Sequence, residues 1–304
     1  MPPTNNLLTA ERISRLGIAL LTRTLVLPRT VSQVPGPEFA GPSGGTVILR
    51  VRVPRDSRVQ ETPNATITFD LVDEVEVPVV LRHHYNGTIV TDEDLSLNLE
   101  SFGQQVLEPQ IAAVAKGAED EAATVLNQIP DTIGDVTDQN FDSRILEARR
   151  ILGRKEVPLG NRWVAMSPEF AEIALGTKLL SEVDASGNPS ALRDAVVGRY
   201  RGFNFIESAG IEAGHAVAYH MSAVGMGIRA PVQPAGAAQS ASASEGGISL
   251  RTVYDYDSSR LSDTLVTSTF AGASLVVDRD EEDSGEPGEA TILKRAVGLS
   301  VNES

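Results

Sequence analysis

The sequence predicts an α+β fold that combines a long β-hairpin, a long amphipathic helix and a compact α/β unit. Apolar and polar residues alternate over 46–59 and again over 66–81, which is the two-residue period of a β-strand. From residue 94 the apolar residues recur every three or four positions, as on one face of a helix. Shorter strand and helix patterns then follow one another between residues 141 and 250.

An excess of acidic residues limits the kinds of partner. The chain of 304 residues has 41 Asp and Glu against 26 Lys and Arg, a net charge of -15. DNA binding requires basic residues that neutralise phosphates, so we expect no general DNA binder, although an acidic wall can enclose DNA without adhering to it. The absence of cysteine excludes disulfides, thiolate catalysis and cysteine-ligated zinc. No signal-peptide pattern and no membrane-length apolar run occurs, so a cytoplasmic protein without membrane contact is expected.

The first 45 residues predict a short helix and an extended arm. Apolar and small residues form one helical stripe, which Pro28 ends; the stripe comprises Ile13, Leu16, Gly17, Leu20 and Leu21. Residues 33–45 are rich in proline and glycine, which excludes regular structure there.

The two alternating segments predict a hairpin with arms of about 40–50 Å, longer than strands of ordinary compact domains. Alternation places Val47, Leu49, Val51 and Val53 on one face of the first arm, and Ile67, Phe69, Leu71, Val75, Val77, Val79 and Leu81 on one face of the second. Charge is segregated between the arms: one carries Arg50, Arg52, Arg55 and Arg58, and the other carries Asp70, Asp73, Glu74 and Glu76.

Two interpretations of the hairpin remain open. It is either the edge of an ordinary sheet with solvated charges, or a loop that projects across a neighbouring subunit. In the second case the eight charged residues form a subunit interface, where opposite charges fix the register and reject wrong partners.

Residues 94–129 predict a helix of about 30 residues, some 45 Å long. Pro109 should kink its first turns or bound a shorter helix. A helix of this length needs a large sheet or another subunit to lie against. Its predicted apolar face comprises Leu107, Ile111, Val114, Ala118, Ala122, Val125 and Ile129.

The remaining chain predicts an α/β unit and further strands. Asp142 should cap a helix over Ser143–Leu152 that ends at Gly153, and Ser167-Pro168 should open another helix. Residues 231–247 are of low complexity and indicate a mobile loop, and the acidic run 278–289 indicates a solvated turn. Strands are predicted at 161–166, 200–206, 216–220, 248–255, 264–277 and 292–301.

A search for catalytic patterns identifies no convincing site. Ser43 lies in a Gly-x-Ser-x-Gly string, and residues 225–230 match a relaxed dinucleotide fingerprint, but neither has the strand and helix context that its chemistry requires. His83 and His84 are adjacent and should point to opposite faces of a strand. His215 and His220 have no further ligand at metal-binding spacing, and the acidic run lacks the pattern of a calcium loop. We therefore expect no catalytic, cofactor or metal site and no enzyme; a serine hydrolase using Ser43 is a remote alternative.

Several segments resemble the major capsid proteins of tailed bacteriophages, which have the fold named after the Hong Kong ninety-seven phage. The coat proteins of the short-tailed Salmonella phage type and of actinobacteriophages are the most similar. The resemblance rests on residues 5–31, 75–122, 162–168, 197–208 and 246–251, and on their order.

The resemblance implies that the chain self-assembles as hexamers and pentamers into an icosahedral shell around the double-stranded DNA of a phage. It implies an N-terminal helix and arm (1–45), an extended loop (46–80), a peripheral domain with a spine helix (81–140 and 251–304) and an axial domain (141–250). The expected partners are other copies of the chain, a portal and a separate scaffolding protein, and a decoration protein is a further candidate. The packaged DNA is expected to be enclosed but not specifically bound. The expected location is the virion capsid, assembled in the host cytoplasm.

Two departures and one alternative accompany the resemblance. Some relatives cross-link their shells through a lysine in the extended loop, but no lysine falls between 46 and 80, so that cross-link is not expected. The chain also enters its arm without a long helical leader, which favours a separate scaffold. An encapsulin-like bacterial compartment would use the same fold, and a neighbouring cargo-enzyme gene would favour it.

Overall fold

The structure is a computed structural model that describes residues 25–34, 45–52, 57, 59, 60, 62, 66, 67, 69, 74–93, 103–177, 196–237, 239–245, 248–279 and 291–301. Its helices are the 3-10 turn η1 (Leu27–Arg29), the π-helical turn η4 (Gly103–Leu107), α2 (Glu108–Leu126), α3 (Phe141–Arg154), α4 (Pro168–Gly176) and the 3-10 turn η6 (Met221–Ala223). Its strands are β1 (Ser32–Gln33), β2 (Thr46–Arg52), β3 (Glu74–Val80), β4 (Arg82–Thr91), β5 (Asp131–Ile133), β6 (Arg162–Met166), β7 (Val196–Tyr200), β8 (Phe203–Glu207), β9 (His215–His220), β10 (Val224–Arg229), β11 (Gln239–Glu245), β12 (Ile248–Asp257), β13 (Ser262–Leu275), β14 (Asp278–Arg279), β15 (Thr291–Ile292) and β16 (Ala296–Ser300).

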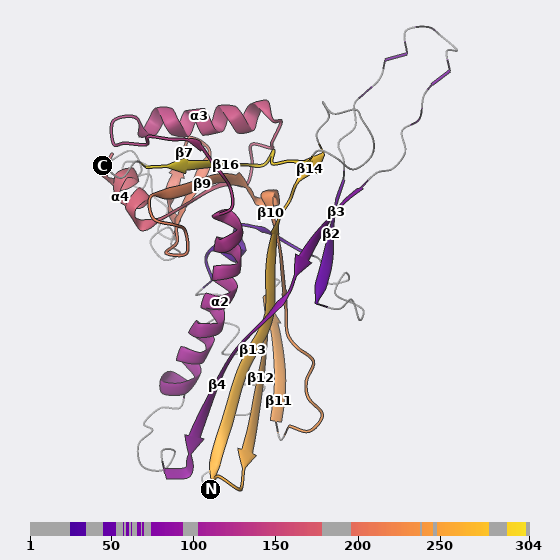
Figure 1. Cartoon of the computed structure of the whole chain (residues 1–304), viewed down its shortest axis with the longest axis vertical. Coiled ribbons are helices and arrows are strands. Elements are labelled where there is room, and N and C mark those ends of the chain that lie inside the picture. Colours follow the sequence, from indigo (N-terminus) through magenta and orange to yellow (C-terminus); the bar gives the residue numbers. More distant parts are fainter. Residues whose placement is uncertain are drawn as a thin grey trace, which may run out of the picture.

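Two sheets of six strands organise the described residues. The long sheet has the order β1-β10-β13-β12-β11, and β4 also pairs with β13. The second sheet has the order β5-β16-β9-β6-β8-β7. In Figure 1 the long strands form the extended lower part, and the second sheet lies with α3 and α4 in the compact upper part. This arrangement confirms the predicted α+β class.

Helix α2 lies along the long sheet and reaches the second sheet at its end (Figure 1). All seven residues of its predicted apolar face are buried. Two of the seven, Ala118 and Ala122, are alanines, whose small side chains let the helix lie close to the strands. Asn127, which follows the helix, donates through Nδ2 to the carbonyl of Gly210 at 3.0 Å, so the loop after β8 is tied to the end of α2. One helix therefore packs against both sheets.

Of the two alternatives predicted for Pro109, the structure shows that it bounds a shorter helix: α2 begins at Glu108, with Pro109 in its first turn, and ends at Leu126. Residues 94–102 of the predicted helix lie outside the described residues. The predicted start and end of the next helix are corrected. Helix α3 begins at Phe141 and extends past Gly153 to Arg154, with Asn140 and not Asp142 at its N-cap position. The carboxylate of Asp142 accepts instead from Arg201 Nε at 2.8 Å.

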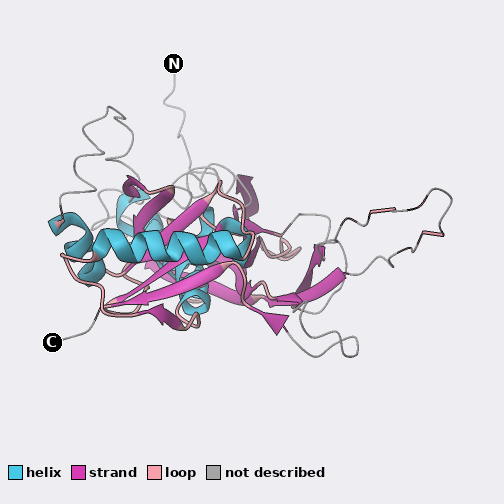
Figure 2. Ribbon diagram, turned by 90° about the horizontal axis from the view of Figure 1, so that it is seen from above, coloured by secondary structure: helices cyan, strands magenta, loops and turns pink. Residues whose placement is uncertain are grey.

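Helices α3 and α4 cover one face of the second sheet (Figure 2), around a core that includes Phe141, Phe170 and Phe205. The α4 start is as predicted: Ser167 is the N-cap, its hydroxyl accepts from Phe170 N, and Pro168 opens the helix. The opposite face of this sheet contributes Val217 and other side chains to the main core around α2.

Three strand predictions are corrected. The single strand predicted over 200–206 is a hairpin of β7 and β8, because Arg201 and Gly202 turn the chain with φ of 50° and 91°. The low-complexity residues 239–245 form strand β11, paired with β12. Asp278, assigned to a solvated turn, is buried in β14 and bound by Arg295.

The proposed domain boundaries remain a prediction. Strands β10 and β11, which lie within 141–250, pair with β13 and β12. Strand β16, which lies within 251–304, pairs with β5 and β9 of the second sheet. The predicted helix over 13–21 lies outside the described residues.

Candidate subunit interface

The stem of the predicted hairpin is an antiparallel pair of β2 and β3. Its register sets Val47 opposite Val79 and Leu49 opposite Val77, so the apolar faces predicted for the two arms lie on the same side. The charged side follows from the same register, because Arg50 lies opposite Glu76 and Arg52 opposite Glu74. Figure 1 shows the stem beside the upper end of the long sheet, away from α2.

The apolar side of the stem is fixed to the long sheet at two glycines. A Cβ on Gly225 of β10 would lie 2.5 Å from Leu49 Cδ2, and a Cβ on Gly272 of β13 would collide with the backbone carbonyl of Val80. The bare glycine backbones let the stem approach the sheet directly. Val47 and Val79 are buried there with Val34, so the root of the hairpin is rigidly placed.

Four of the eight predicted interface residues lie in the described stem. Arg50 Nη1 lies 3.8 Å from Glu74 Oε2, and the two side chains are 61% and 36% exposed. Glu76 lies on the exposed side of β3, and only the backbone of Arg52 is described. The other four, Arg55, Arg58, Asp70 and Asp73, lie outside the described residues.

Apolar side chains beyond the stem are not covered by the described part of the chain. Val59, Ile67 and Phe69 are 85%, 56% and 84% exposed. Scattered exposed apolar residues are ordinary. Ile67 and Phe69, however, belong to the apolar face predicted for the second arm, the face whose Val77 and Val79 are buried at the stem. Such a surface is typical of a protein-protein contact.

The strand that follows the hairpin anchors it to α2. His84 Nε2 lies 3.3 Å from Glu121 Oε1, and Arg82 Nη1 lies 3.4 Å from the same oxygen. A Cβ on Gly117 would collide with the His84 ring. Burial, followed by the charge of Arg251, lowers the pKa of His83, whose ring packs on Phe270 at 4.7 Å on the other face. The two histidines therefore point to opposite faces, as predicted.

The catalytic patterns do not acquire the geometry that they need. Thr46, directly after the string around Ser43, begins strand β2, and Ser43 itself lies outside the described residues. Residues 225–229 of the dinucleotide-like string lie within strand β10. His215 Nδ1 is 2.7 Å from Asp131 Oδ1, and His220 Nδ1 is 2.8 Å from Ser222 Oγ.

Among the described residues, no group of three or more potential metal ligands occurs. None of their helices is both long and apolar enough to cross a membrane.

Sequence reasoning missed the contacts that seat the hairpin. Gly225 and Gly272 carry no local turn signal, because their role depends on strands β2 and β3 crossing them. It also missed that residues 25–34, assigned to the arm, are docked in the main core, where Leu25, Leu27 and Val31 are almost fully buried. The apolar character of these three residues was the available signal.

Comparison with known proteins identifies a family for part of the chain. Residues 110–245, from the first turn of α2 to the end of β11, match the family described as phage capsid protein. No curated protein matches the chain.

Solved structures from two phages and from a virus-like particle share the fold over almost the whole chain. A structure from Mycobacterium phage Che8 is 17% identical, with a TM-score of 0.59 and 90% of each chain covered. The capsid of Ralstonia phage GP4 is 7% identical, with a TM-score of 0.61 over 90% of this chain and 88% of that one. A virus-like particle from Pyrococcus furiosus is 10% identical, with a TM-score of 0.52 over 95% and 98% of the two chains. The predicted tailed-phage capsid fold is therefore confirmed.

Proposed function

We infer that this chain is the major capsid protein of a tailed bacteriophage. The phage capsid family match and the shared fold support this function. Copies of the chain form the hexamers and pentamers of an icosahedral shell, which encloses the double-stranded DNA of the phage. The role is mechanical, and no catalytic step is needed for it.

The main support for the assembly proposal is the difference in burial between the hairpin stem and the residues beyond it. Its stem is held on the long sheet by Val47 and Val79, whereas Val59, Ile67 and Phe69 are exposed further along. A rigid root with an uncovered apolar extension is suited to reach a neighbouring copy. Burial of the extension there would be favourable by about 25 cal/mol per Å² of apolar area.

The eight charged residues of the hairpin are proposed to set the register of this contact. Arg50 and Glu74 are separated by 3.8 Å and remain exposed, so they are available to a neighbouring subunit. Exposed pairs contribute little to the stability of a single chain. Opposite charges can nevertheless steer the encounter and reject wrong alignments.

The remaining partners and the division into domains are also proposals. We assign the N-terminal arm to 1–45, the extended loop to 46–80, the peripheral domain to 81–140 and 251–304, and the axial domain to 141–250. A portal and a separate scaffolding protein complete the particle, which assembles in the host cytoplasm, and a decoration protein is a further candidate partner.

An encapsulin-like compartment is the second candidate. The shared fold with the virus-like particle from Pyrococcus furiosus is the observation that favours it, since the fold alone does not separate the two roles. The match of residues 110–245 to a phage capsid family favours the phage. A portal or terminase gene beside this one would decide for the phage, and a cargo-enzyme gene would decide for the compartment.

Electron microscopy of the purified protein tests the proposed function directly, because closed shells are visible without an assay. A deletion then tests the hairpin. Because Arg52 lies opposite Glu74, residues 53–73 can be replaced by Asn-Gly, which favours a two-residue hairpin turn. We expect this variant to keep its far-UV circular dichroism and to form no shells.

A second variant, which keeps the full length of the hairpin, replaces Val59, Ile67 and Phe69 by Ser. These side chains are exposed, so the subunit should remain folded while assembly fails. Closed shells of normal size from both variants would refute the hairpin contact. Absence of shells from the native chain, even when it is produced together with the scaffolding protein of its phage, would refute the proposed function.

A further inference from the structure

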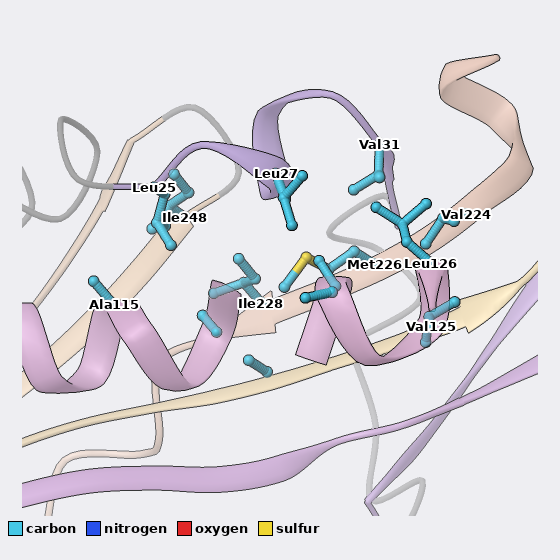
Figure 3. Close-up of a cluster of buried hydrophobic side chains, with 14 of the residues drawn as sticks. Leu25, Leu27, Val31, Ala115, Val125, Leu126, Val224, Met226, Ile228 and Ile248 are labelled. Atoms are coloured by element: carbon cyan, nitrogen blue, oxygen red, sulfur yellow. The ribbon is translucent and has the colours of Figure 1, made fainter. Parts of the chain in front are cut away.

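Residues 25–34, hereafter the seated segment, occupy a trough between α2 and the long sheet. Figure 3 shows Leu25, Leu27 and Val31 pointing toward Ala115 and Leu126 of α2 and toward side chains of β10. All three are at most 1% exposed. Strand β1 of the seated segment runs parallel to β10. The segment is thus a part of the main core, although it enters from a stretch predicted to be an arm.

One side chain of α2 holds the seated segment through its backbone. The carboxylate of Glu119 accepts from Val26 N at 3.0 Å and from Leu27 N at 3.0 Å and 3.1 Å. These amides open the turn η1, which has no side-chain N-cap of its own. Glu119 therefore supplies from another element the acceptor that an N-cap residue would supply locally. Ser208, after β8, donates to the same carboxylate at 3.3 Å.

The other end of the seated segment contacts the hairpin stem. Val34 N donates to the carbonyl of Met226 at 2.9 Å. The Val34 side chain is buried with Val47 of β2 and Val79 of β3. The seated segment thus touches α2 at one end and the root of the hairpin at the other.

We propose that the seated segment is a latch, in which Glu119 of α2 holds residues 25–34 and Val34 fixes the hairpin stem, so that release at Glu119 loosens the hairpin. The physical basis is that the Glu119 contact and the Val34 contact lie on one short stretch of backbone. Loss of the Glu119 acceptor leaves two amides without partners, one of them in the fully buried Leu27, and buried unpaired amides are costly. Because Val34 lies only seven residues beyond Leu27, its contact with Val47 and Val79 depends on the same docking.

The latch bears on the proposed function because the position of the hairpin would set its reach toward the next subunit. Only the biological role of the latch rests on the proposed function. The coupling between the Glu119 contact and the hairpin stem is a property of a single chain. It can therefore be measured on single subunits separated from assembled material.

Hydrogen exchange of the full-length subunit tests the latch. In Glu119→Ala, the amides of Val26 and Leu27 and those of β2 and β3 should exchange about tenfold faster or more, as expected from the loss of two charge-assisted hydrogen bonds. Glu119→Gln keeps an oxygen acceptor and should retain most of the protection. Asp120→Ala removes an exposed carboxylate from the next position and should exchange like the native chain.

A second variant separates docking from coupling. Val34→Ala should accelerate exchange in β2 and β3 by a similar factor, while Val26 and Leu27 stay protected by Glu119. If Glu119→Ala does not fold, as judged by circular dichroism, Val34→Ala alone decides. Unchanged exchange in β2 and β3 in a folded Glu119→Ala would overturn the latch, because release at Glu119 would then leave the hairpin stem unaffected. Unchanged exchange in β2 and β3 in Val34→Ala would overturn it as well. Neither outcome depends on whether shells form.

Discussion

Gly272 and Val80 are in direct backbone contact: strand β3 crosses β13 so closely that a Cβ on Gly272 would collide with the carbonyl of Val80. Gly272 does not adopt a backbone conformation that only glycine favours. The residue is therefore required for space, and it fixes how near the hairpin stem lies to the long sheet.

Substitution of Gly272 by alanine should displace the stem. The obstructing atom belongs to the backbone and cannot rotate away, so we expect a loss of about 1–3 kcal/mol in the free energy of unfolding and faster amide exchange in β3. Urea denaturation and hydrogen exchange measure the two effects. Gly87→Ala is the control, because its Cβ would meet Val266 Cγ2 at an ordinary 3.5 Å. Equal effects in both variants would contradict the close crossing.

Reversal of the charge on Arg50 should affect assembly far more than folding. The side chain is 61% exposed and 3.8 Å from Glu74, so Arg50→Glu should change the free energy of unfolding by less than about 1 kcal/mol. Light scattering should record slower shell assembly, by roughly tenfold. The swapped variant Arg50→Glu/Glu74→Arg restores opposite charges within the hairpin. Full recovery of assembly in that variant would show that the pair acts only inside one chain.

Removal of Arg295 should destabilise the chain strongly. Its guanidinium binds Asp278 through Nε at 2.8 Å and donates to Ser222 Oγ at 3.0 Å. The Asp278 side chain is only 7% exposed, so Arg295→Ala leaves a buried carboxylate without its cation. We expect a cost of about 3–5 kcal/mol, measured by urea denaturation. Arg260→Ala breaks an exposed pair with Asp257 at 3.6 Å and should cost less than about 1 kcal/mol. Similar costs for the two variants would argue against a buried pair at Asp278.

The stability difference between Glu119→Gln and the native chain should depend on pH. Burial raises the pKa of the Glu119 carboxyl above its ordinary value of 4.5, although hydrogen bonds from Leu27, Val26 and Ser208 oppose the change. A carboxyl with a raised pKa in the folded state contributes its stability below the unfolded pKa and loses it as pH rises through the folded value.

Urea denaturation from about pH 4 to about pH 7 tests this sign. The native chain should lose stability relative to Glu119→Gln as the pH increases, because the glutamine stays neutral. Other titrating groups cancel in the difference between the two proteins. A difference that changes in the opposite direction would mean that the hydrogen bonds outweigh burial at Glu119.

The sequence predicted the elements whose pattern is repeated locally. The apolar face of α2 follows from a spacing of three and four, and all seven residues assigned to it are buried. The strands predicted over 46–59 and 66–81 were too long: β2 and β3 pair over 46–52 and 74–80, and the described residues 57, 59, 60, 66, 67 and 69 lie outside strands. Within the paired part, the alternation placed the apolar residues on one side, as observed.

The missed features depend on residues far apart in the chain. The Glu119 carboxylate accepts hydrogen bonds from backbone amides 92 and 93 positions away. Nothing in the helix pattern distinguishes this residue from a solvated glutamate. Arg162, only 2% exposed, donates to the carbonyl of Pro158 at 2.8 Å, where the sequence indicates merely the start of a strand. Strand β11 was assigned to a loop because its serines and alanines have weak strand propensity, which pairing with β12 overrides.

The contact of α2 with both sheets has a mechanical consequence. A rotation of the compact upper part against the long strands would disturb the main core, because residues of α2 and of both sheets are buried together there. Part of the buried face of α2 consists of the small side chains of Ala115, Ala118, Ala122 and Ala123. In a closed shell, the angle between the two sheets of each subunit, and with it the curvature of the shell, would thus depend on how α2 packs between them.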